Sequence, residues 1–135
     1  MNIASFDDLL NAARYQPLPQ RLLFVFATVE LPEGSSPQQQ ADFAAGQGGA
    51  LVPLMCVDKS PQELDSFAVL AAEADLMEKE WGMVFAAALS GTVGNPPTSE
   101  DAEAPLQRMV EAVKTGHIDG YIPFDHQGLP VQLSQ

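Results

Sequence analysis

Two apolar runs in the chain are each followed by a short polar stretch, and these stretches carry the side chains that could do chemistry. The first run covers residues 50–57 and contains the thiol of Cys56, and the second covers residues 81–89. Ligands of open α/β sheets bind beyond the carboxyl ends of the strands. If both runs are strands, backbone N–H groups and polar side chains at one rim could bind an anion or a small ligand. The candidate residues at this rim are Asp58, Lys59, Ser60, Ser90, Gly91 and Thr92.

Both polar stretches also have an ordinary structural interpretation. Asp58, Lys59 and Ser60 are typical of a turn between a strand and a helix, with Ser60 as the N-cap. Residues 90–95 contain two glycines but lack the lysine and spacing of a P-loop and the pattern of a dinucleotide-binding loop. The rim is therefore a hypothesis for ligand binding, and no cofactor is predicted.

The chemistry of Cys56 and of the two histidines is restricted too. A cysteine inside an apolar strand usually behaves as a small hydrophobic side chain. A reactive thiolate needs a nearby base or positive charge, and only Lys59, His117 and His126 are candidates. No cysteine, aspartate or glutamate stands at metal-ligand spacing from either histidine, so no metal site is predicted. His126 follows an aspartate and precedes Gln-Gly, which is typical of a turn.

The charge balance limits the classes of partner. Eighteen acidic residues face six basic ones, for a formal net charge of −12. The basic residues are scattered singly, whereas phosphate backbones are bound by clustered Lys and Arg, so we expect neither nucleic-acid nor anionic-membrane binding. The acidity serves solubility, or it forms a face that recognises a basic partner. The apolar runs are too short to span a bilayer, residues 1–20 show no signal peptide, and a lone cysteine agrees with the cytoplasm.

Apolar residues at i, i+3, i+4 and i+7 predict three helices. The first follows an N-cap at Ser5 and runs to residue 13. The second opens at Ser60, where a proline and a glutamate complete the pattern of a capping box, and reaches residue 71. The third has Pro105 in its first turn and ends at Gly116.

Three apolar runs read as strands buried on both faces: Leu22–Leu31, Ala50–Val57 and Trp81–Leu89. Pro53 indicates an edge position or a bulge in the second. Residues 121–124 and 130–133 flank a glycine-bearing turn and predict a C-terminal hairpin, which is either core or an exposed edge for a second copy. Residues 32–49 form either a weak helix or a mobile loop.

These elements predict a single domain over residues 1–135. Helices alternate with strands, which indicates an α/β architecture with four or five strands in a mixed sheet. If residues 32–49 are a loop, the first two strands can pair as an antiparallel hairpin, and the fold becomes α+β.

Several segments resemble a known family. The segments are residues 48–61, which run from Gly48 to Pro61 and include Cys56, and residues 86–91, 104–110 and 122–125. They resemble a family of small bacterial proteins that often carry the label "ribonucleotide reductase alpha subunit", over essentially the whole chain. The resemblance implies no activity and no catalytic residue for this chain. Residues 52–64 are also similar, by a generic strand, acidic turn and helix start, to the SseB-like domain of secretion-enhancer proteins.

The reductase label fails a chemical test. Radical reduction of ribonucleotides requires a thiyl cysteine and a redox-active pair, and one cysteine cannot supply three thiols. The resemblance therefore implies at most an accessory role. The sequence favours a non-enzymatic interaction protein whose partner is an unknown protein or a second copy of the chain. The alternatives are a domain that binds a small ligand or anion at the rim, and an enzyme that uses Cys56 with a histidine.

Overall fold

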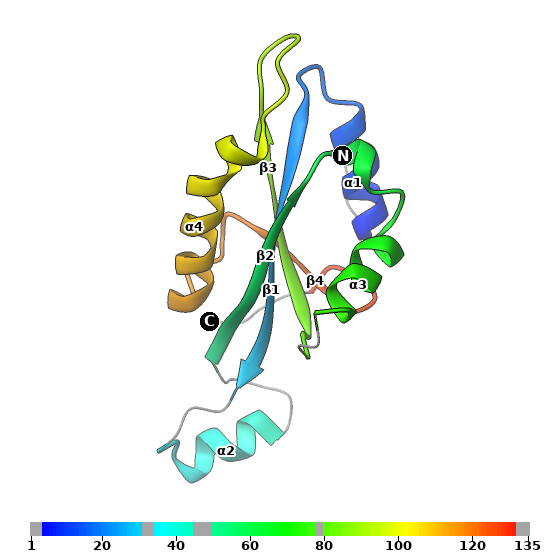
Figure 1. Ribbon diagram of the computed structural model, residues 1–135. Coiled ribbons are helices and arrows are strands. Elements are labelled where there is room, and N and C mark those ends of the chain that lie inside the picture. Colours follow the sequence, from blue (N-terminus) through cyan, green and yellow to red (C-terminus); the bar gives the residue numbers. More distant parts are fainter. Residues whose placement is uncertain (1–3, 31–33, 45–49, 78–79, 132–135) are drawn as a thin grey trace.

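The computed structural model describes residues 4–30, 34–44, 50–77 and 80–131, which build a four-stranded antiparallel sheet between two layers of helices (Figure 1). The strands are β1 Gln20–Glu30, β2 Ala50–Lys59, β3 Met83–Ser90 and β4 Ile122–Asp125, in the order β2-β1-β3-β4. Helices α1 (Phe6–Arg14) and α3 (Phe67–Asp75) cover one face, and α4 (Ser99–Thr115) covers the other. The fold is α+β. The sequence predicted a mixed sheet, but all three strand pairs are antiparallel, including β1 and β2 on either side of the segment that joins them.

Strand β1 is the centre of the molecule. Residues 22–27 are all buried because alternate side chains point to opposite faces and both faces are covered. Phe24 joins a cluster with Phe6 and Phe124 on the α1 and α3 side. Val25 packs towards Met109 of α4 on the other side. The prediction of a strand buried on both faces is confirmed here.

Strand β2 differs from that prediction. It is an edge strand with half-buried side chains, and Cys56 is exposed rather than enclosed in the core. The register with β1 shifts between Phe26 and Ala27, so that Phe26 opposes Met55 and Ala27 opposes Pro53. Pro53 thus lies at both an edge and a bulge. A proline has no backbone N–H for a ladder hydrogen bond, and such positions tolerate it.

Two helix starts were misplaced by the sequence prediction. The segment after Ser60 forms only the short 3₁₀ turn η1 (Pro61–Glu63), and α3 begins six residues later at Phe67. Helix α4 begins at Ser99, because Thr98 and Asp101 form a capping box, and Pro105 lies inside it. The helix continues through the proline, which the sequence prediction had placed in the first turn.

The remaining segments match the predictions in part. Within residues 32–49, α2 (Pro37–Ala44) is helical, and the prediction for the rest of that stretch lies largely outside the described residues. In Figure 1, α2 lies beyond the ends of β1 and β2. The C-terminal hairpin is reduced to β4 and one bridge between Phe124 and Pro130, and the Val131 N–H donates to the carbonyl of Pro123 at 3.1 Å. A turn holds His126 in place, as predicted.

Candidate functional site

The antiparallel pairing brings the two predicted strand ends together. Both β2 and β3 run antiparallel to β1, so they run parallel to each other and end at the same end of the sheet. The register places Lys59 opposite Leu22 and Ser90 opposite Gln20. The polar residues after β2 and β3 therefore flank the beginning of β1. One rim does collect the candidate side chains, although each is engaged within the protein.

Asp58 is held in a three-residue network. Its Oδ2 accepts hydrogen bonds from Arg21 Nε at 2.5 Å and from Ser99 Oγ at 2.7 Å, and Arg21 Nη2 donates to the same serine oxygen at 2.6 Å. Partial burial acts to raise the pKa of Asp58, but the hydrogen bonds from Ser99 and Arg21 and the charge of Arg21 outweigh it and lower the pKa. The carboxylate ties β2 to β1 and α4. Its role is structural.

The other candidates on the β2 side are engaged as well. Lys59 alternates with Asp58 and faces the α1 and α3 layer, where its Nζ lies 3.1 Å from a carboxylate oxygen of Glu73. The N–H and hydroxyl of Ser60 donate to Glu63 Oε1 at 3.4 and 3.1 Å. Lys59 and Asp58 thus point to opposite faces and cannot act together on one ligand.

The loop after β3 uses its own N–H groups. The Gly91 N–H donates to the carbonyl of Pro19, and Thr92 and Asn95 exchange backbone hydrogen bonds at 3.1 and 2.9 Å. Ser90 Oγ bonds to the side chain of Gln20 at 2.9 Å. The N–H groups of Gly91, Thr92 and Asn95 thus donate within the protein and are not available to an anion. Residues 90–95 are better described as a connecting loop than as a ligand-binding loop.

Cys56 has none of the predicted activators beside it. It lies on the α4 side of β2, because it opposes Val25, whose side chain belongs to the cluster with α4. His126 stacks on Trp81 at a ring distance of 4.1 Å, in the layer on the opposite face, and His117 Nδ1 bonds to Thr115 Oγ1 at 2.9 Å. Within the described part of the chain, no group of three His, Cys, Asp or Glu is arranged to hold a metal ion.

Sequence reasoning missed a cavity next to the rim. It has a volume of about 330 Å³ and lies between the end of α1, residues 16–21, η1 and Pro96–Pro97. Among the six candidate residues only Ser60 lines it, and the charged side chains on its wall are Arg14, Arg21 and Glu63. The sequence held one signal for it: proline-rich connections at residues 17–19 and 96–97 that meet at one end of the sheet.

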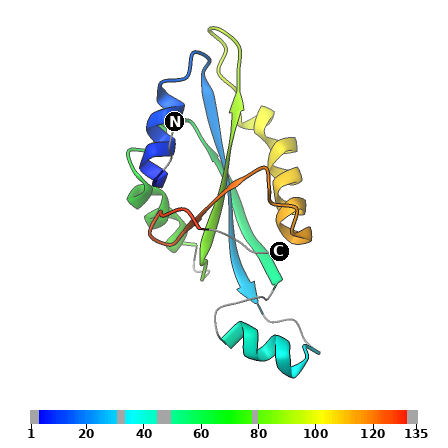
Figure 2. The same cartoon turned by 180° about the vertical axis from the view of Figure 1, so that it is seen from behind.

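The outer edge of β2 is the second candidate site. Over the described residues β2 pairs with β1 alone, and in Figure 1 no element lies in front of it. The opposite edge differs: from behind, Figure 2 shows β4 and the C-terminal segment crossing the sheet, and residues 129–131 bond back to β4. β2 is therefore open along its whole length, whereas on the other side only Ala87–Ser90 of β3 lack a strand partner in the described structure. The use of the C-terminal hairpin as an edge for a second copy stays a prediction.

Comparisons with protein-family models, with curated proteins and with solved structures returned no match. The resemblance given by residues 48–61 therefore stays a prediction. No helix in the described ranges combines the length and apolarity that crossing a membrane requires.

Proposed function

We propose that this chain is a non-enzymatic interaction module that receives a strand of another chain along the outer edge of β2. The single observation that carries the proposal is that edge, which extends over ten residues without a strand partner in the described structure. An edge strand presents backbone hydrogen-bonding groups that a partner strand can satisfy. A cytoplasmic accessory protein of a bacterial cell fits this proposal and the family resemblance.

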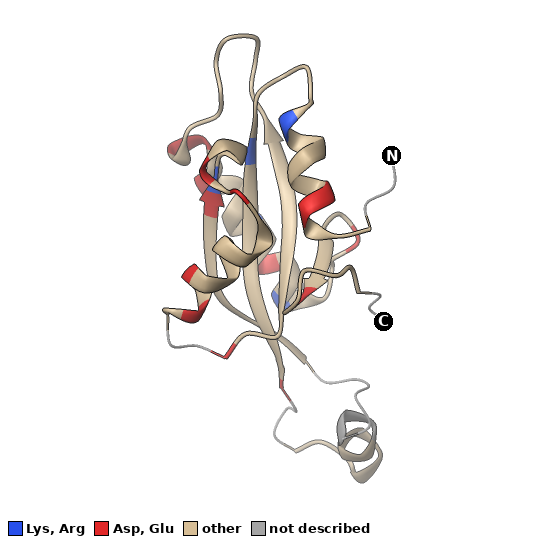
Figure 3. Ribbon diagram, turned by 90° about the vertical axis from the view of Figure 1, so that its right-hand side faces the viewer, with Lys and Arg blue, Asp and Glu red and all other residues tan. Residues whose placement is uncertain are grey.

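The side chains of β2 support the same role. Residues 50–57 carry no charge, although the whole chain carries a net charge of −12. In Figure 3 most of the red and blue segments lie on helices and loops, and the strands are largely tan. Apolar side chains at an edge gain from being covered by a partner. The simplest occupant is a second copy of the chain, because a two-fold pairing of identical edges is the commonest form of association.

The first experiment measures the molar mass of the full chain by analytical ultracentrifugation, for wild type and two variants. Cys56→Lys places a charge on the exposed side of the edge, as natural edge strands do to prevent pairing, and Cys56→Ser is the matched control. We expect a dimer for wild type and Cys56→Ser and a monomer for Cys56→Lys. Circular dichroism checks that each variant folds.

The same variants distinguish the occupants. Added salt screens repulsion between two acidic copies and should strengthen a homodimer, whereas it should weaken the binding of a basic partner. If wild type stays monomeric at all salt concentrations, the second copy is excluded. A tagged pull-down must then yield a stoichiometric partner that wild type and Cys56→Ser retain and Cys56→Lys loses. Failure of both experiments refutes the interaction module.

A further inference from the structure

The cavity beside the rim has the dimensions of a ligand site. Its volume of about 330 Å³ falls in the range of natural small-molecule pockets, which begins near 300 Å³. Its walls come from three separate stretches of the chain, residues 13–21, 60–63 and 96–97, so its shape depends on the folded chain. None of the residues on its wall belongs to β2.

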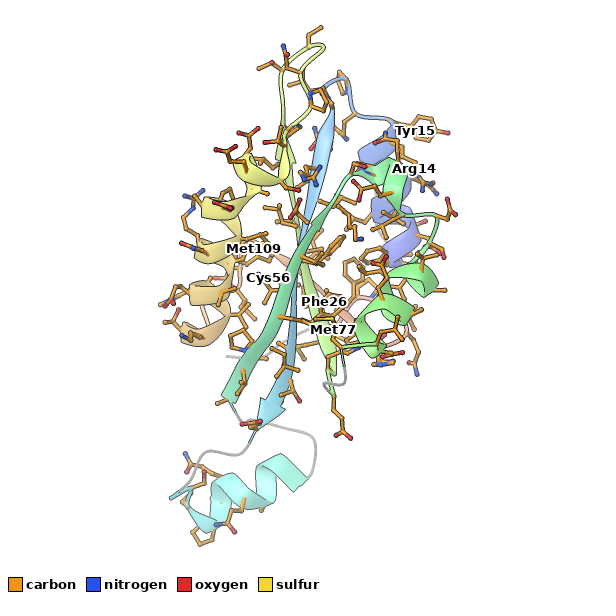
Figure 4. All side chains as sticks on the ribbon, viewed as in Figure 1. Arg14, Tyr15, Phe26, Cys56, Met77 and Met109 are labelled. Carbon is orange, nitrogen blue, oxygen red and sulfur yellow. The ribbon has the colours of Figure 1, made fainter. Side chains whose placement is uncertain are left out.

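The charges on the cavity wall are unequally compensated. Arg21 is neutralised by Asp58. Glu63 accepts from the N–H and hydroxyl of Ser60. Arg14, at the end of α1 (Figure 4), donates from Nη1 to Asn11 Oδ1 and from Nη2 to the carbonyls of Pro61 and Leu64, all of which are neutral acceptors. Among the described ion pairs none involves Arg14 or Glu63, so one positive and one negative charge lie at the cavity wall without a partner of opposite sign.

The rest of the wall is suited to an organic molecule. Pro19, Pro61, Pro96 and Pro97 supply rigid apolar surface, and Gln62 supplies an amide beside them. Such a wall contacts the carbon skeleton of a ligand. Arg14 Nη2 donates within the protein, so a carboxylate would be held by a charge-assisted hydrogen bond to a remaining guanidinium N–H of Arg14. Arg14 attracts one carboxylate, and the Glu63 carboxylate on the same wall repels a second negative charge, which favours a monoanion over a phosphate dianion.

We propose that the cavity binds a small organic monocarboxylate, with Arg14 as the group that holds the carboxylate. Arg21 and the proline walls define the shape of the site, and the Arg21–Asp58–Ser99 network keeps Arg21 at its wall. This site is independent of the edge of β2, and either proposal can fail without the other.

The test is a titration of the full chain, followed by two-dimensional ¹H–¹⁵N NMR, with three probes: benzoate, its neutral isostere benzamide, and inorganic phosphate. Fragments of about ten atoms bind weakly, so each probe is taken to about 20 mM. We expect benzoate to shift amide signals in residues 13–21 and 60–63, and benzamide and phosphate to leave them unchanged. The proposal is overturned if benzoate moves none of these signals, or if benzamide or phosphate moves them equally.

Variants test the role of Arg14. Arg14→Gln should weaken benzoate binding about tenfold or more, because the charge-assisted pair is lost. Arg108→Gln makes the same charge change on the exposed surface of α4, outside the cavity wall, and should bind like wild type. Arg14→Lys keeps the charge without the planar fork and should lie between them. Equal binding by Arg14→Gln and wild type overturns the assignment, and the NMR spectrum itself shows whether each variant is folded.

Discussion

Replacing Asp58 with asparagine tests whether the network at the rim holds three elements together. The side chains of Arg21 and Asp58 are only 14% and 18% exposed, so solvent screens their interaction little. Asp58→Asn keeps the shape but removes the charge, which weakens the hydrogen bonds from Arg21 and Ser99. Hydrogen bonds to charged groups contribute about 1.5–3 kcal/mol. We expect the free energy of unfolding to fall by about 2 kcal/mol at pH 7.

The pH dependence of this loss is the sharper part of the prediction. The pKa of Asp58 is lowered in the folded protein, so its stabilising effect is complete above the ordinary pKa of 3.8 and is lost as the pH falls through the lower folded pKa. Wild type and Asp58→Asn should therefore differ at pH 7 and become equal in strong acid.

Urea denaturation across this pH range measures both effects, and a thermal scan should show a melting temperature lower by about 6–10 °C at pH 7. Glu103→Gln makes the same charge change on the exposed face of α4 and serves as the control, with an expected change within about 0.5 kcal/mol. The reasoning is refuted if Asp58→Asn is as stable as wild type at pH 7, or if the difference persists below the folded pKa.

Three further substitutions test other contacts by thermal and urea denaturation. Trp81→Phe removes the indole N–H that donates to Asp75 Oδ1 at 3.0 Å and reduces the surface on which His126 stacks, so it should cost about 1–2 kcal/mol; an unchanged stability would show that neither contact matters. Gly128→Ala should cost about 2 kcal/mol or more, since φ is +82° and the added Cβ would lie 2.9 Å from the ring of Phe67; a stabilised variant would contradict this geometry. Pro105→Ala should stabilise the protein by about 2 kcal/mol, because it restores an N–H donor inside α4; a loss of stability would mean that the helix depends on the proline.

The sequence predicted the centre of the fold better than its periphery. The run around Val25 is apolar at every position, as a strand covered on both faces requires. In the structure β1 is covered on both faces. The run around Cys56 is almost as apolar, yet β2 lies at an edge. Composition does not distinguish these cases, because the position of a strand in the sheet depends on long-range pairing. Only Pro53 indicated the edge.

Helix boundaries failed where two local signals competed. Ser60 and Glu63 look like the start of a long helix, but they close a single 3₁₀ turn, and the chain is extended again at Leu64. Pro105 looks like a first-turn proline, but the capping box at Thr98 begins the helix earlier. In both cases two acceptable local patterns overlapped, and the sequence alone did not show which of them begins the helix.

The candidate site was predicted in position but not in detail. The rim exists because β2 and β3 end on either side of β1. The partners of its residues could not be predicted, since Arg21 and Asp58 are separated by 37 positions and Ser99 lies 41 positions beyond Asp58. The cavity beyond the rim was missed for the same reason: Arg14 and Pro97 have no sequence relationship that would place them on one wall.

The two sheet edges differ in how much of each is open to strand addition. Residues 129–131 return along β4 and bond to Pro123 and Asp125, and β4 itself pairs with Met83–Ala86 of β3. On that side only Ala87–Ser90 of β3 lack a strand partner in the described structure, whereas β2 is open over its ten residues. A pairing through β2 would therefore consume the long edge and leave a short one, which offers few ladder hydrogen bonds for repeated strand addition.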